Sequence, residues 1–295
     1  MRVIRLLLIT SLVLQACGGP GHEANEAEDA MTNYVDKEVG SDIIMVDGSL
    51  FSIPSPIESA MFIKDNSKGF REDILLNPSS ADLFATNSKK ALALGVYGSD
   101  LGYVSLYEQD EKSLSYMGAA RKLADDIGIT GAFSETLVRR FSNNIGKPDS
   151  LVVLVSDIYK AGDDYLKSND RNDIAALVLL GGWVESFYIT CLEAKTGSAP
   201  FKKRIAEQKN GLMRLKEMLD KYPDNSAIQE LTPQIEKLAQ DFSKVTSTYV
   251  FKRPEVIDAE QKTILKGHTD HDISEATLAD IIAHTLALRA QITQN

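Results

Sequence analysis

The stretch IAALVLLGGWVESFYITCL, from Ile174 to Leu192, decides the fold. Its residues are apolar on nearly every side of a helix, which is typical of the central helix of a bundle. A membrane-spanning helix is the alternative, because a span of about 30 Å needs about 20 such residues. The paired glycines Gly181 and Gly182, the charged flanks, and Glu185 at mid-helix favour the buried helix.

Apolar residues recur at helical spacing on both sides of this stretch. The pattern starts near residue 79, and clusters of Gly, Pro, Asn and Asp separate its segments. The predicted helices are Ser79–Glu108, Glu111–Ile127, Phe133–Asn144, Asp149–Lys167, Arg171–Lys195, Pro200–Lys221, Ser226–Phe251 and Ile273–Thr293. Short connections make successive helices antiparallel neighbours, so the predicted fold class is all-α, an irregular helical bundle or an array of antiparallel helical hairpins.

Two places mark the ends of this helical region. Near residues 43–54, an Asp-Gly pair at 47–48 lies between two short β-branched runs and predicts a hairpin or a short extended segment. A proline-rich stretch follows, and a helix is expected to open at residues 55–56. Near the other end, the spacing of Asp272 and Glu275 predicts a capping box with Asp272 as the N-cap of the last helix.

The helix predicted over Ser79–Glu108 carries two stripes of special residues. Three glycines spaced three and four apart offer a face for close backbone approach: Gly95, Gly98 and Gly102. The second stripe, called here the tyrosine stripe, consists of Tyr97, Asp100, Tyr103 and Tyr107. We favour a structural interpretation, in which phenols or a cation satisfy a buried aspartate. The alternative is a ligand pocket in which Asp100 and Glu185 face one void and do acid–base work.

The first residues resemble a bacterial lipoprotein signal peptide. Arg2 and Arg5 precede the apolar run LLLITSLVL, which is too short to span a membrane. The run ends in LQAC at residues 14–17, which resembles a lipobox with Cys17 as the lipidated residue, although a glutamine stands where a small residue is usual. We therefore expect residues 1–16 to be removed and Cys17 to anchor the chain in the membrane. An ordinary secretory signal with an incidental cysteine is the alternative.

Residues 17–42 are expected to form a disordered tether. Seven acidic residues and one lysine lie between residues 18 and 42, so this stretch alone has a net charge of −7 + 1 = −6. An acidic run after the lipidated cysteine resembles a surface-export signal, and a simple solvated spacer explains it equally well. We therefore expect an outer-membrane lipoprotein on either the periplasmic or the surface face. Residues 43–295 are expected to form a single all-helical domain.

Charge and motifs limit the chemistry. The net charge is −10 and the isoelectric point about 5.0, so no nucleic-acid partner is expected. The sequence contains no HExxH, GxSxG, GxGxxG or phosphate-loop motif, so no catalytic residue and no cofactor are assigned, and the balance leans away from an enzyme. No metal site is predicted; the nearest candidates are His268 and His271, which we interpret as part of a polar loop.

The segment at residues 202–221 is the most basic part of this acidic chain. A solvated helix face with ion pairs at i,i+4 spacing, such as Glu217 with Lys221, explains it best. Contact with an anionic partner or lipid headgroups is the alternative.

Four segments resemble those of a known group of proteins. They are SIPSPIESA, LGVYGSDLGYVSLYEQ, LADDIGI and NDRNDIAALVLLGGWVESFY, and they lie between Ser52 and Ala194. Together they resemble a family of uncharacterised all-helical lipoproteins of Bacteroidota. The resemblance implies an envelope location and a helical domain, and it supplies no activity and no catalytic residue.

These observations lead to two functional hypotheses. The first is a lipid-anchored, non-catalytic helical module that binds a protein or another component of the envelope. The second is a small-molecule binding protein or an unrecognised enzyme, with a pocket near Asp100, Tyr103 and Glu185.

Overall fold

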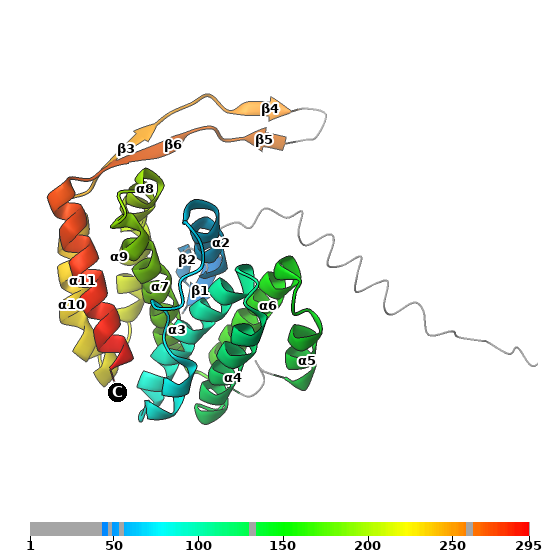
Figure 1. The fold of residues 1–295 in the computed structure, drawn as a ribbon. Helices are drawn as coiled ribbons and strands as arrows, with labels where there is room; N and C mark the ends of the chain where they lie inside the picture. Colours follow the sequence, from blue (N-terminus) through cyan, green and yellow to red (C-terminus); the bar gives the residue numbers. More distant parts are fainter. Residues whose placement is uncertain (1–42, 47–48, 53–55, 130–133, 258–261, 295) are drawn as a thin grey trace, which may run out of the picture. The chain divides into compact units, whose positions relative to one another are not determined.

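A computed structural model describes residues 43–46, 49–52, 56–129, 134–257 and 262–294 (Figure 1). These residues are mostly α-helical, which confirms the predicted all-α class. The helices are α2 (Pro56–Asn66), the 3-10 helix η1 (Pro78–Leu83), α3 (Asn87–Leu106), α4 (Asp110–Asp126), α5 (Glu135–Asn143), α6 (Pro148–Ser168), α7 (Asn172–Ala194), α8 (Ala199–Glu207), α9 (Lys209–Leu219), α10 (Ser226–Ser243) and α11 (Glu275–Thr293). The strands are β1 (Ile43–Val46), β2 (Ser49–Ser52), β3 (Thr246–Val250), β4 (Glu255–Ile257), β5 (Lys262–Ile264) and β6 (His268–Asp272).

Helix α7 is the central helix of the bundle. It packs against α2, α3, α6, α8, α9 and α11, and its residues are buried around most of its circumference. Among the described residues it is the one helix that is long and apolar enough to cross a membrane, but 83% of that apolar window is buried inside the protein. Its apolar surface is therefore used in a continuous core that extends from Ile57 in α2 to Ile292 in α11.

Helices α3 and α7 cross backbone to backbone through glycines. A Cβ atom added at Gly95 of α3 would lie 2.0 Å from the carbonyl oxygen of Val178, and one added at Gly181 of α7 would lie 2.0 Å from that of Leu92. Real Cβ atoms do not approach backbone so closely, so both positions require glycine. The predicted close-approach face is confirmed at Gly95, and the glycine pair of α7 has the same cause.

Two predicted helices are each divided. The prediction Ser79–Glu108 becomes η1 and α3, because the chain is extended at Phe84 and Thr86, and the hydroxyl of Thr86 caps α3 by accepting from the amide of Lys89. The prediction Pro200–Lys221 becomes α8 and α9. They meet at Gln208, a buried residue whose side chain accepts a hydrogen bond from Trp183.

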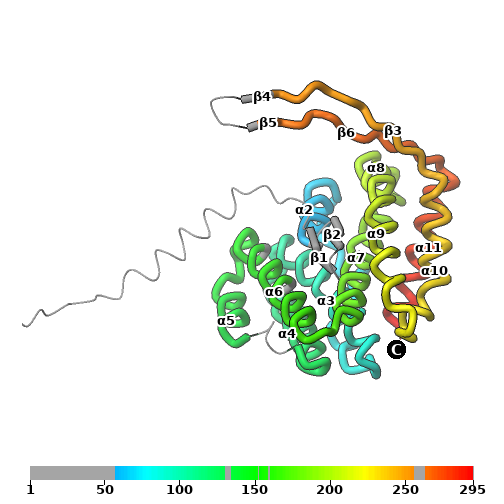
Figure 2. Tube along the Cα trace, turned by 180° about the vertical axis from the view of Figure 1, so that it is seen from behind, coloured from blue at the N-terminus to red at the C-terminus, as the bar shows by residue number. Residues whose placement is uncertain are grey.

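The prediction of a helix as far as Phe251 is wrong beyond Ser243. The run TSTYV at 246–250 is rich in β-branched and aromatic residues, which favour strands, and it forms β3. Strand β3 pairs antiparallel with β6, and β4 pairs antiparallel with β5, in two-stranded sheets. We call residues 246–257 and 262–272 the arm; in both views its two sides lead from the ends of α10 and α11, which lie side by side (Figures 1 and 2).

A change of register interrupts the arm. Val250 pairs with His268 and Glu255 pairs with Ile264, so four residues on one strand, including Pro254, face three on the other. An extra residue on one strand is a bulge, and a proline fits there because it has no amide to donate to the ladder.

The two predicted ends of the helical region have different outcomes. The hairpin near residues 43–54 is confirmed as β1 paired with β2, although its predicted turn at 47–48 lies outside the described residues. The predicted cap at Asp272 is wrong, because Asp272 is paired with Thr246 at the end of β6. Ser274 is the N-cap of α11, and its hydroxyl accepts from the amide of Thr277.

Replacing Gly181 by alanine tests the α3–α7 crossing. The new methyl group must push the two backbones apart, so we expect the free energy of unfolding to fall by about 3 kcal/mol or more. Urea denaturation of the full chain measures this change.

Gly118→Ala is the matched control. Gly118 lies in α4, and nothing lies within 4 Å of an added Cβ. Alanine stabilises an open helical position by about 1 kcal/mol relative to glycine. Equal effects of the two substitutions would contradict the crossing described here.

Candidate functional site

The tyrosine stripe of α3 holds the segment 67–77, which connects α2 to η1. Each polar group of the stripe forms a hydrogen bond with one residue of this segment. Tyr97 Oη donates to the carbonyl of Asn77 at 2.8 Å, and Asp100 Oδ2 accepts from the amide of Leu76 at 3.1 Å. Tyr103 Oη accepts from the amide of Arg71 at 3.0 Å, and Tyr107 Oη lies 2.5 Å from Ser67 Oγ. Phe70 also stacks on Tyr103, with ring centroids 5.6 Å apart. The stripe therefore binds the protein's own chain.

Asp100 and Glu185 do come together, as the sequence suggested, and a third residue joins them. Both carboxylates are fully buried. Arg289 of α11 donates two hydrogen bonds to Glu185, from Nε to Oε2 at 3.0 Å and from Nη2 to Oε1 at 3.1 Å, and its guanidinium lies 4.6 Å from the centroid of the Tyr188 ring. The two buried acids, Asp100 and Glu185, therefore share one cation, Arg289.

Burial favours the neutral form of Asp100. Burial raises the pKa of the Asp100 carboxyl well above its ordinary value, and the negative charge of Glu185 raises it further. Burial also raises the pKa of Glu185, and the charge of Arg289 opposes that rise. A side-chain hydrogen bond also joins the carboxyl groups of Asp100 and Glu185, which requires a proton on one of them. The network thus carries one proton on Asp100 and one ion pair, an arrangement that keeps isolated charge out of the core.

The cavity found in the described residues lies elsewhere. It has a volume of about 60 Å³ and lies among α3, α4, α6 and α7, lined mainly by apolar side chains. Asp163 of α6 is the acidic residue in its wall; one carboxylate oxygen accepts from Lys167, and Oδ1 is buried without a partner. Neither Asp100 nor Glu185, nor any tyrosine of the stripe, lines this cavity.

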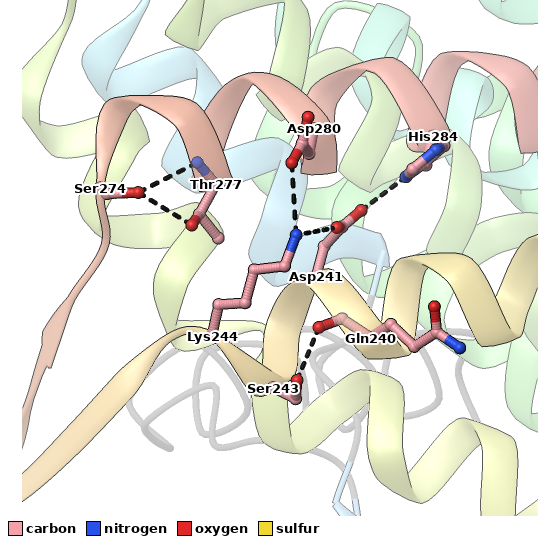
Figure 3. Close-up of polar contacts among 8 residues, drawn as sticks. All are labelled: Gln240, Asp241, Ser243, Lys244, Ser274, Thr277, Asp280 and His284. Atoms are coloured by element: carbon pink, nitrogen blue, oxygen red, sulfur yellow. Dashed lines mark hydrogen bonds and ion pairs between the residues drawn. The ribbon is translucent and has the colours of Figure 1, made fainter.

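A second polar cluster fixes the base of the arm (Figure 3). Asp241 of α10 is almost fully buried, and its carboxylate binds His284 Nδ1 of α11 at 2.5 Å and Lys244 Nζ at 2.9 Å. Lys244 also reaches Asp280 at 3.3 Å. Burial would raise the pKa of Asp241, but the hydrogen bonds from Lys244 and His284 outweigh it and lower the pKa. The cluster therefore ties α10 to α11 where the arm starts and ends.

An aspartate that orients a histidine also occurs in acid–base catalysis. Here the aspartate oxygens are occupied by Lys244 and His284, and the cluster joins two helices at the base of the arm. The structural role explains each of these contacts.

The two metal candidates lie on β6. Successive side chains of a strand point to opposite faces, so His268 and His271, three residues apart, lie on different faces of the arm. His271 Nδ1 lies 2.9 Å from the hydroxyl of Ser247, and His268 Nε2 lies 3.5 Å from Asp270. No group of three metal-ligating side chains occurs among the described residues. The prediction that His268 and His271 lie in a polar loop is wrong, because these residues form a strand.

The arm exposes large apolar side chains. Leu265 is 79% exposed, Phe251 is 72% exposed and Tyr249 is 65% exposed, more than any other large apolar side chain in the described part of the chain. The aromatic ring of Tyr249 covers Gly267, where an added Cβ would lie 2.1 Å from the phenol oxygen. An exposed apolar group on a protruding element is typical of a contact surface.

The basic segment at 202–221 is mostly neutralised within the chain. Its ion pairs are Lys202–Glu275, Lys203–Glu207, Arg204–Glu58, Arg214–Glu217 and Lys216–Asp220. Glu217 pairs with Arg214 one turn before it. The segment forms α8 and α9, whose apolar sides pack into the core.

Sequence reasoning found Asp100 and Glu185 but missed Arg289 and the arm. Arg289 is a single cation in the otherwise apolar run of α11, and that contrast was a readable signal. The run of β-branched and aromatic residues before Pro254 was the signal for the arm. Cys17 lies outside the described residues.

Comparison of the chain with protein-family models, with curated proteins and with solved structures finds no match. Function is therefore inferred from the residues of this chain alone.

Replacing Asp100 by asparagine tests the neutral buried acid. Between the ordinary pKa of aspartate and the raised pKa of Asp100, the folded protein keeps a proton that the unfolded chain releases. The free energy of unfolding then falls as pH rises, by up to about 1.4 kcal/mol per pH unit for one proton. Asparagine has no such proton, so we expect Asp100→Asn to flatten the decline that begins above the ordinary pKa of aspartate, about 4.

Urea denaturation at several pH values measures this slope. Ser99→Ala is the control, because Ser99 is buried on the same helix and bonds to Ser186 at 2.8 Å but does not titrate in this range. It should lower stability by the same amount at every pH. A wild-type slope in Asp100→Asn would show that Asp100 is ionised in the folded protein.

Proposed function

We propose that this protein is a lipid-anchored lipoprotein of the cell envelope, held in the outer membrane through Cys17. The support is the signal sequence at residues 1–16 and the lipobox-like LQAC at 14–17. The acidic stretch that follows serves as a spacer between the anchor and the folded domain. The proposal is compatible with a position on either face of the outer membrane, periplasmic or surface.

We further propose that the protein acts as a non-catalytic binding module and that the arm is its contact surface. The observation that carries this proposal is the exposure of Tyr249, Phe251 and Leu265 on a two-stranded ribbon. A two-stranded ribbon is only marginally stable in water by itself. Burial of these side chains against a partner would supply the stability that the ribbon lacks.

The helical bundle suits the role of a scaffold for the arm. The buried acids Asp100 and Glu185 are engaged by Arg289 and by the segment 67–77, and the tyrosine stripe holds that same segment. The Asp241 cluster then fixes the arm to the ends of α10 and α11. A rigid base positions a contact element better than a free loop does.

Small-molecule binding is the second candidate, and the apolar cavity beside Asp163 supports it. Its volume of about 60 Å³ is well below the roughly 150 Å³ of an apolar cavity that accepts benzene. Such a ligand would therefore be very small or would enter only in part.

Palmitate labelling of growing cells tests the anchor. The native protein should incorporate the label, and Cys17→Ser should abolish it because the thiol that accepts the lipid is lost. Cys191→Ser is the matched control, since Cys191 is fully buried and burial raises the pKa of its thiol to about 12. Labelling that survives Cys17→Ser would contradict lipidation at this residue.

Photo-crosslinking in intact cells tests the arm. A photoreactive phenylalanine analogue at Phe251 should give adducts with a protein or with a lipid, because this side chain would be buried against the partner. The same analogue at Leu114 of α4, which is 47% exposed, is the control. Adducts at position 114 and none at position 251 would show that the arm is not the contact surface.

A further inference from the structure

We infer that the arm docks on an anionic lipid bilayer. This inference rests on the proposed function and names the partner of the same surface. It concerns the apolar and basic residues at and beside the register change of the arm, which we call the arm patch: Tyr249, Phe251, Lys252, Arg253, Leu265 and Lys266.

The apolar members of the arm patch suit the interface of a bilayer. Two of the three are aromatic, and aromatic side chains are enriched where lipid headgroups meet the apolar region. All three side chains are more than half exposed, so insertion would bury surface that no described residue covers. Insertion needs no rearrangement of the helical core, because the arm lies outside it, across the ends of the helices (Figure 1).

The basic members give the arm patch a charge opposite to that of the chain. Residues 249–253 and 264–267 contain three cations and no acid, although residues 246–272 as a whole contain four Lys and Arg against five Asp and Glu. The positive charge is therefore confined to the arm patch. Lys266 pairs with Glu255 across the arm. Lys252 and Arg253 are exposed and make no ion pair among the residues that the structure describes, so both can reach lipid phosphates.

The negative charge of the rest of the chain determines which part of the protein can approach an anionic membrane. An anionic surface repels an acidic body, so approach is favourable only where the local charge is positive. The cations of the other basic segment, at 202–221, are mostly paired within the chain. The arm patch combines exposed apolar groups with two cations, Lys252 and Arg253, that make no ion pair in the described part of the chain. This combination suits a lipid surface, because the cations can meet anionic headgroups while the aromatic and aliphatic groups enter the interface.

The docked arm and the lipidated cysteine would form two contacts with one membrane. Stable membrane attachment commonly combines an acyl anchor with a second signal. The arm would then hold the helical bundle at a fixed orientation instead of at any point within the reach of the spacer.

Sedimentation with lipid vesicles tests the inference. The protein used is the chain from Gly18 onward, which lacks the anchor but keeps every described residue. Vesicles of phosphatidylcholine are compared with vesicles that also contain phosphatidylglycerol. We expect binding only to the second kind, weakening as salt is added.

Two double variants separate the contribution of the cations to vesicle binding from that of the apolar side chains. Lys252→Gln with Arg253→Gln should weaken binding about 30-fold, from two lost contacts with the anionic surface. Phe251→Ser with Leu265→Ser should weaken it about tenfold or more, from lost insertion. Circular dichroism checks that the exposed substitutions leave the fold intact.

Matched variants elsewhere on the surface are the controls. Lys203→Gln with Arg214→Gln changes the net charge equally, and Leu83→Ser with Leu114→Ser removes two exposed apolar groups of the bundle. Both should bind like the native chain. Equal weakening by the controls and the arm variants would overturn the inference.

Further outcomes separate this inference from the proposed function. Failure of the native chain to bind phosphatidylglycerol vesicles would overturn the lipid partner, and discrete protein adducts at Phe251 would then keep the arm as a protein-binding surface. A dimer in sedimentation equilibrium that Phe251→Ser dissociates, without vesicle binding, would assign the surface to a second copy. Absence of both vesicle binding and adducts would overturn the inference and the proposed function together.

Discussion

The close crossing of α3 and α7 is the constraint on which the other features of the bundle depend. Glycine at positions 95 and 181 lets the two backbones touch, and each helix is then buried along most of its length. Once two long helices are buried side by side, every polar group on their facing and flanking sides must find a partner inside the protein. The positions of Asp100 and Glu185 follow from this constraint.

The bundle satisfies these buried groups with distant parts of the chain. The segment 67–77 meets the tyrosine stripe from one side, and Arg289 of α11 meets Glu185 from another. The network therefore joins the first helices to the last one through a few directional contacts. Apolar packing alone tolerates several arrangements, whereas a bidentate ion pair next to a protonated acid accepts very few.

Local patterns in the sequence were sufficient to predict the structure where a segment is completely buried. The apolar run 174–192 and its glycine pair predicted a buried helix in close contact with another, because no other soluble environment accommodates that pattern. Local patterns could not predict a contact whose two residues are far apart in the sequence. Arg289 is 104 residues from Glu185, and no local spacing reveals such a pair. Asp272 was predicted as the N-cap of α11, but its pairing with Thr246 in a strand leaves that role to Ser274. Cys17 and the acidic stretch after it remain predictions.

The separation of Glu185 from Arg289 also affects how the chain folds as it is made. At about 5–20 residues per second, 104 residues take roughly 5–20 s to synthesise. During that interval the acid of α7 has no counterion, and burying it ionised would be costly. Until α11 is made, Glu185 must therefore either carry a proton or stay in contact with water. Its ion pair with Arg289 can form only when nearly the whole chain has been synthesised.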